Sequence, residues 1–166
     1  DIPIVMYNVP GRTGVNMLPS TVAKLAKIKN IVGLKEASGD INQISQIVRE
    51  CGEDFDVLSG DDSMTFPIMA VGGKGVISVV ANIVPREMAG LVEAFNRGDI
   101  KKAREIHLKM FPLFGAMFYE TNPIPVKTAM SLMGMISDEI RLPLCKMSEE
   151  NLAKLKTTLK EYKLIS

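Results

Sequence analysis

The sequence places a lysine at the end of an apolar run, a position that favours amine chemistry. Lys35 follows Ile31–Leu34, an apolar run typical of a strand that is covered on both faces. Because desolvating an ammonium group is costly, such a position favours the neutral amine. A neutral amine can attack a carbonyl carbon and form a Schiff base, which makes the adjacent carbon acidic. The alternative is a lysine that reaches the rim and pairs with a carboxylate such as Glu36.

Two further side chains of suitable chemistry lie near the start of the chain. Tyr7 ends the apolar run that precedes Lys35. Ends of neighbouring parallel strands lie about 4.8 Å apart, so the phenol could pass protons to a Schiff-base intermediate. Arg12 lies between Gly11 and Gly14, and a guanidinium group matches a carboxylate through two hydrogen bonds. The alternatives are a strand-end tyrosine with a hydrated hydroxyl group and an ordinary surface arginine.

Other polar residues favour structural roles. The doublet Asp61-Asp62 has the composition of a metal pair, but we interpret it as helix capping. His107 is the only histidine and falls within a predicted helix, so a Ser-His-Asp arrangement is excluded. Gly72–Gly75 lacks the spacing of a phosphate-binding loop. We therefore expect neither a metal nor a cofactor, because an imine at Lys35 would itself act as the electron sink.

The elements that would position these residues follow an α/β pattern. Apolar runs predict strands over residues 2–7, 31–34, 55–58 and 76–80, with helices over 21–28, 41–51 and 63–71 between them. Helices alone are predicted afterwards, over residues 85–96, 99–112, 123–133 and 148–162, and Asp40, Asp99 and Ser148 are expected N-caps. The pattern predicts four βα units in residues 1–98 and a helical domain in residues 99–166. Ligands of such sheets bind at the carboxyl ends of the strands, which is where Tyr7 and Lys35 lie.

Composition narrows the classes of function. The 166 residues carry 20 Lys and Arg against 19 Asp and Glu, a net charge of +1, which argues against nucleic-acid binding driven by charge. Two cysteines are too few for a disulfide framework or a cysteine-based zinc site. No apolar run reaches the roughly 18 residues of a membrane span, so we expect no membrane partner and a cytoplasmic setting. The chain opens directly into a predicted strand, which indicates a chain joined partway through a domain.

Several segments together resemble one family. Tyr7–Gly14 resembles the tyrosine motif of the dihydrodipicolinate synthase (4-hydroxy-tetrahydrodipicolinate synthase) family, and Gly33–Gly39 resembles its Schiff-base lysine strand. Three further segments match in the same order, namely Ser59–Asp62, Gly75–Asn82 and Asn122–Lys127. The family fold is a (β/α)8 TIM barrel with a C-terminal helical domain. The resemblance implies that this chain is the last four βα units of such a barrel followed by that domain.

The resemblance also implies an activity, a lyase reaction of lysine and diaminopimelate biosynthesis. Pyruvate would condense with L-aspartate 4-semialdehyde, with Lys35 forming the imine, Tyr7 relaying protons and Arg12 holding the carboxylate of the semialdehyde. Neuraminate lyases share the lysine and tyrosine but usually lack the arginine, so Arg12 favours the synthase. Three more contacts are implied: the backbone carbonyl of Ile77 at the pyruvate pocket, and Gly60 and Asp61 beside the semialdehyde.

A full barrel has eight strands, and only four are predicted here. The family's threonine pair, its cross-dimer tyrosine and most of its lysine-feedback site would lie outside this chain. We therefore hypothesise a C-terminal fragment that pairs with the missing N-terminal half or with another copy, as a homo-oligomer. Two alternatives stay open: a catalytically incomplete half-barrel that serves as an assembly module, and another pyruvate aldolase of the neuraminate lyase type.

Overall fold

A computed structural model describes residues 2–166. Packing divides the chain into two compact units. The first holds residues 2–78 together with 95–98, and the second holds residues 79–94 together with 99–166. The expected boundary between a barrel portion and a helical domain, after residue 98, stays a prediction.

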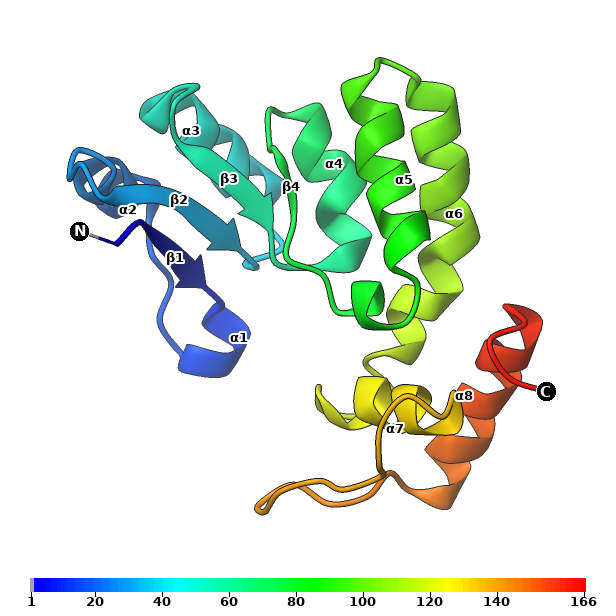
Figure 1. The fold of residues 1–166 in the computed structure, drawn as a ribbon. Helices are drawn as coiled ribbons and strands as arrows, with labels where there is room; N and C mark the ends of the chain where they lie inside the picture. The colour runs from blue at the N-terminus through cyan, green and yellow to red at the C-terminus, as the bar shows by residue number, and fades with distance from the viewer. Residues whose placement is uncertain (1) are drawn as a thin grey trace. The chain divides into compact units, whose positions relative to one another are not determined.

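The first unit contains a four-stranded parallel sheet (Figure 1). Its strands are hydrogen-bonded in chain order, and they are β1 (Ile4–Asn8), β2 (Ile31–Glu36), β3 (Asp56–Ser59) and β4 (Gly75–Val76). All three neighbouring pairs are parallel. The α/β pattern predicted from the apolar runs is therefore confirmed, and all four carboxyl ends meet at one edge of the sheet.

Helices cover one face of this sheet and bury its apolar side chains. They are α2 (Pro19–Leu25), α3 (Ile41–Cys51) and α4 (Thr65–Ala70), with the short α1 (Pro10–Thr13) and the 3-10 turn η1 (Asp62–Met64) in the loops. The core consists of Val22, Leu34, Ile44, Ile47, Phe55, Val57 and Ile68, each at most 5% exposed. Burying each large aliphatic side chain stabilises the fold by roughly 1.5–3 kcal/mol. Asp40 is the N-cap of α3, as predicted.

Two elements differ from the sequence prediction. A strand was expected over residues 76–80, but β4 ends at Val76 because its partner β3 already ends at Ser59. The helix expected to stop at Pro112 instead continues through it to Ala116 as α6 (Ile100–Ala116). Pro112 has no N–H to donate to the carbonyl of Leu108, so α6 continues with one intrahelical hydrogen bond fewer.

The second unit is helical. It contains η2 (Val80–Asn82), most of α5 (Pro85–Asn96), α6, α7 (Ile124–Leu132) and α8 (Glu149–Glu161). Helices α6 and α7 both pack against α8, burying Leu155 and Leu159 completely. The predicted caps Asp99 and Ser148 are confirmed, because each side chain accepts a hydrogen bond from the first turn of its helix.

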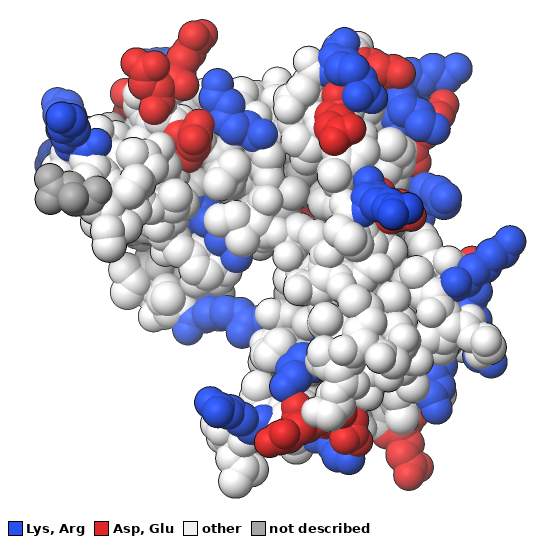
Figure 2. All heavy atoms as spheres, viewed as in Figure 1, with Lys and Arg blue, Asp and Glu red and all other residues white. Residues whose placement is uncertain are grey.

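Charges of both signs occur on the surface. On the face drawn in Figure 2, acidic and basic side chains occur together over each unit. Among the described residues, none of the helices is both long enough and apolar enough to cross a membrane.

Candidate functional site

The structure brings Tyr7 and Lys35 together. The two residues are register partners at the carboxyl ends of β1 and β2. The Lys35 Nζ lies over the Tyr7 ring, 4.2 Å from its centroid. The convergence expected from two strand ends is therefore confirmed, and the amine contacts the face of the ring.

The two faces of β1 and β2 have different surroundings. Side chains alternate along a strand, so Tyr7 and Lys35 share one face while Asn8 and Glu36 share the other. On the first face Lys35 is half-buried and Tyr7 is 48% exposed. On the second face Glu36 and Asn8 are 0% and 2% exposed, beneath the helices. The lysine therefore stands on the open face of the sheet, where a small molecule can reach it.

Gly60 leaves the space that the lysine side chain occupies. It follows β3, and its N–H donates to the carbonyl oxygen of Glu36 at 2.7 Å. A Cβ atom on Gly60 would lie 3.2 Å from the Lys35 Cε and 2.7 Å from the Ala37 Cβ. A side chain at position 60 would therefore crowd both Ala37 and Lys35.

The other predicted site residues lie on loops at the same edge of the sheet. Arg12 is exposed in the last turn of α1. Ile77 follows β4, is 43% exposed and donates its N–H to the Ser59 carbonyl at 2.9 Å. The Asp61 carboxylate caps η1 by accepting from the Ser63 N–H at 2.8 Å, which confirms the capping interpretation for Asp61, whereas Asp62 lies within η1. Their roles toward substrate stay predictions.

Sequence reasoning missed a buried polar cluster on the opposite face. Glu36 accepts hydrogen bonds from the side chains of Asn8 and Gln43 and from the Ser38 N–H. The proposed alternative for Lys35, an ion pair with Glu36, is disfavoured because the two adjacent side chains point to opposite faces. The sequence did hold a signal for this: successive side chains of a strand point to opposite faces, so Glu36 must face the helices if Lys35 faces the open side.

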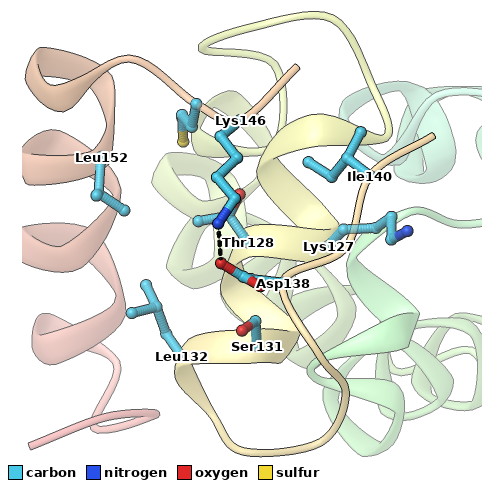
Figure 3. Close-up of a pocket in the computed structure, with 9 residues that line it drawn as sticks. Lys127, Thr128, Ser131, Leu132, Asp138, Ile140, Lys146 and Leu152 are labelled. Carbon is cyan, nitrogen blue, oxygen red and sulfur yellow. Dashed lines mark hydrogen bonds and ion pairs between the residues drawn. The ribbon is translucent and has the colours of Figure 1, made fainter. Parts of the chain in front are cut away.

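A cavity of ≈ 230 Å³ lies in the second unit, between α7, α8 and the segment that joins them. Figure 3 shows Lys146 and Asp138 facing each other there, joined by an ion pair. The other lysine of the lining, Lys127, donates from Nζ to the Glu139 carbonyl at 2.5 Å. Both lysines of the lining therefore hold oxygen partners.

The remaining candidate groups have structural surroundings. His107 is buried against the rings of Phe111 and Phe114, and burial lowers its pKa. Hydrogen bonds from Asn151 and Ser148 lower the pKa of Glu120. Among residues 2–166 no group of three His, Cys, Asp or Glu side chains is placed to hold a metal ion.

The fold and the site define the class of this protein. It is a parallel α/β protein with a lysine and a tyrosine side by side at the carboxyl ends of neighbouring strands. The chain belongs to the dihydrodipicolinate synthetase family, whose family model matches residues 1–162. The resemblance seen in the motifs is thereby confirmed.

Known members are similar over part of their length. The 4-hydroxy-tetrahydrodipicolinate synthase of Geobacter sulfurreducens is 62% identical over 164 residues, covering 99% of this chain and 57% of that protein. The crystal structure of dihydrodipicolinate synthase from Aquifex aeolicus matches with a TM-score of 0.97 at 53% identity, over 99% of this chain and 56% of that one. The crystal structure of the chloride-inhibited dihydrodipicolinate synthase from Acinetobacter baumannii, complexed with pyruvate, matches with a TM-score of 0.96 at 39% identity. The match covers 99% of this chain and 57% of that one. This chain therefore spans a little over half the length of these relatives.

Proposed function

We propose that this chain carries the imine-forming site of a 4-hydroxy-tetrahydrodipicolinate synthase, which condenses pyruvate with L-aspartate 4-semialdehyde. The observation that supports it most directly is the Lys35 Nζ held 4.2 Å from the centre of the Tyr7 ring at the carboxyl edge of a parallel sheet. Family membership and the names of the relatives support the same activity.

The chemistry follows from an amine at this edge. Lys35 Nζ attacks the keto carbon of pyruvate, and loss of water gives an iminium. The iminium withdraws electrons and acidifies the pyruvate methyl group, so loss of a proton gives a nucleophilic enamine. The enamine carbon attacks the aldehyde carbon of the semialdehyde. The amino group of the product then attacks the iminium carbon, which closes the ring and releases Lys35. Tyr7 relays the protons of these steps.

Arg12, Gly60, Asp61 and Ile77 surround the same edge and would bind substrate. The Arg12 guanidinium holds the semialdehyde carboxylate, while the backbone carbonyl of Ile77 faces pyruvate. In this proposal the chain supplies the last four βα units of a (β/α)8 barrel and its helical domain. The preceding half comes from a further segment or another copy, in a cytoplasmic homo-oligomer.

Borohydride trapping tests the proposal. The protein is incubated with pyruvate, reduced with borohydride and digested with trypsin. A reduced pyruvate adduct blocks cleavage after Lys35 and yields the modified peptide Asn30–Arg49. Two proteins are tested: the 166-residue chain, and a full-length chimera in which this chain replaces the matching segment of the Geobacter sulfurreducens synthase. We expect the adduct in the chimera, with condensation of the semialdehyde.

Two variants control this experiment. Lys35→Ala should abolish the adduct, whereas Lys127→Ala removes another half-buried lysine and should leave it unchanged. A folded chimera without adduct or turnover contradicts the proposal. An adduct in the chimera but not in the isolated chain means that the site needs the preceding half of the barrel.

A specific observation favours a second candidate, an assembly module without activity of its own. Strand β1 is an edge strand, and its apolar residues Ile4 and Val5 are 45% and 44% exposed. An apolar edge strand is a template for pairing with another segment. Self-association of the folded chain, with no adduct in the chain or the chimera, would favour this candidate.

Arg12 separates the synthase from a pyruvate aldolase of the neuraminate lyase type. In the chimera, Arg12→Ala should retain the pyruvate adduct at Lys35. It should lose the preference for the semialdehyde over aldehydes without a carboxylate. An unchanged preference would favour the other aldolase.

A further inference from the structure

Glu36 is a buried carboxylate next to the proposed imine lysine. Its side chain is 0% exposed, and it projects beneath the helices of the first unit. A carboxylate without solvent is costly unless other groups replace its hydration. The groups that replace it therefore reveal what holds the residue in place.

Neutral N–H donors supply this replacement. The Asn8 Nδ2 donates to Glu36 Oε2 at 2.9 Å and to Oε1 at 3.1 Å. The Ser38 N–H donates to Oε1 at 2.6 Å, and the Gln43 Nε2 donates to Oε2 at 3.4 Å. Since every one of these partners donates, Glu36 acts here as an acceptor only.

Four more hydrogen bonds extend the cluster. The Asn8 Nδ2 also donates to Asn16 Oδ1 at 2.8 Å, and its Oδ1 accepts from the Met17 N–H at 3.0 Å. Asn16 and Gln43 exchange hydrogen bonds in both directions, at 2.8 and 3.1 Å. The resulting amide network, defined as Asn8, Asn16, Glu36 and Gln43, joins β1, the segment before α2, β2 and α3.

The network lies directly behind the candidate site. Asn8 and Glu36 are register partners, as are the preceding residues Tyr7 and Lys35. The hydrogen bonds on one face therefore fix the two strand ends whose other face carries the phenol and the amine. Asn8 directly follows Tyr7 in β1, and Glu36 directly follows Lys35 in β2. A shift of Asn8 relative to Glu36 must therefore also shift Tyr7 relative to Lys35.

We propose that Glu36, acting through Asn8, is a positioning residue for the Tyr7–Lys35 pair; this inference rests on the proposed function. Glu36 touches neither substrate nor the reacting atoms. It keeps the amine over the ring by locking the ends of β1 and β2, so its loss slows imine formation in a protein that remains folded. A misplacement of about 1 Å at a reacting group can cost on the order of a hundredfold in rate.

An exchange of the amide and the carboxylate tests this role. Glu36→Gln introduces an NH2 group where every neighbour donates, and Asn8→Asp sets two carboxylates against each other. The double variant Asn8→Asp/Glu36→Gln restores one carboxylate and one amide. If the amides of Asn16 and Gln43 both turn over, every donor again meets an acceptor. The structure therefore predicts that the double variant recovers what each single variant loses.

The assay is pyruvate trapping in the full-length chimera, with the rate measured at saturating pyruvate and the half-saturating concentration measured separately. Circular dichroism confirms that each variant is folded at the assay temperature. We expect the maximal trapping rate of Glu36→Gln to fall roughly tenfold to a hundredfold. The half-saturating concentration should change little, and the double variant should regain most of the rate. Glu50→Gln, the same change on the exposed side of α3, should trap like the unmodified chimera.

The outcomes separate this inference from the proposed function. Absence of trapping in the unmodified, folded chimera refutes the function itself. Normal trapping with a normal rate in folded Glu36→Gln overturns the positioning role alone, as does a folded double variant that stays slow. If Glu36→Gln does not fold, Gln43→Met is tested in its place. This variant removes only the Gln43 donor, so Glu36 still accepts from Asn8 and Ser38. A smaller fall in its trapping rate supports the role, and an unchanged rate overturns it.

Discussion

Gly60→Ala is the sharpest perturbation of the candidate site, because its effect on Lys35 can be calculated from the structure. The added Cβ would lie 2.7 Å from the Ala37 Cβ and 3.2 Å from the Lys35 Cε. Favourable carbon–carbon separations begin near 3.5 Å, so these contacts are short by about 0.8 and about 0.3 Å. The first distance involves an atom fixed to the backbone, whereas the second involves a flexible chain. The sheet therefore bears the cost in stability, and the lysine moves.

Two separate effects should follow. Overpacking against Ala37 should lower the free energy of unfolding by about 1–3 kcal/mol. Displacement of the Lys35 Cε moves Nζ away from the Tyr7 ring, which should slow pyruvate trapping by roughly tenfold in folded protein. Urea unfolding measures the first effect, and borohydride trapping in the full-length chimera measures the second.

Gly33→Ala is the matched control. A Cβ on Gly33 would lie 2.6 Å from the Asp56 carbonyl oxygen on β3, an equally severe contact that does not involve Lys35. We expect a comparable loss of stability with nearly normal trapping in the protein that remains folded. If Gly60→Ala traps as fast as Gly33→Ala, the space at Gly60 does not control the lysine and the reasoning fails.

Three further predictions concern the ring, a carboxylate and a helix cap. Tyr7→Phe keeps the ring beneath Lys35 but removes its hydroxyl group, so pyruvate trapping and condensation in the chimera should both fall on the order of a hundredfold; unchanged rates would contradict a proton relay. The depressed pKa of Glu120 means that its stabilisation is complete above its ordinary value of 4.5 and is lost as pH falls through the lower folded value. Glu120→Gln should therefore unfold at lower urea at pH 7, with the difference vanishing at acid pH, and a constant difference would refute this. Asp40→Ala removes the N-cap of α3 and should lower the free energy of unfolding by about 1 kcal/mol in urea titrations, which an unchanged midpoint would contradict.

The sequence was sufficient to predict the parallel sheet and the meeting of Tyr7 with Lys35. Continuous apolar runs separated by helix-length segments leave few arrangements other than parallel strands, and parallel strand ends meet at one edge. The limits of β4 were not predictable in the same way, because Ile77 and its successors are apolar enough for a strand, whereas the pairing of β4 with β3 ends at Val76 and Ser59. Helix continuation through Pro112 was not predictable either, because a proline within a helical pattern usually ends the helix at the preceding residue.

The amide network was hidden for a different reason. Asn8 and Glu36 are polar residues that follow apolar runs, and ordinary loop residues occur in the same sequence pattern. Their burial depends on α3 placing Gln43 above the strand ends, and on Asn16 returning to the same point. Such contacts join four separate segments, so no local spacing in the sequence predicts them.

The buried polar residues also specify which face of the strands is open. A slip of one residue along β2 would exchange its two faces. Lys35 would then enter the apolar core in which Leu34 is now buried. Glu36 would lose its amide donors and lie on the open face. Both changes are unfavourable, since each separates a polar group from its partners. An apolar pair in place of Asn8 and Glu36 would pack in either register with a smaller penalty. The network therefore does more than fill space: it makes the register with Lys35 beside Tyr7 the one in which the buried polar groups are satisfied.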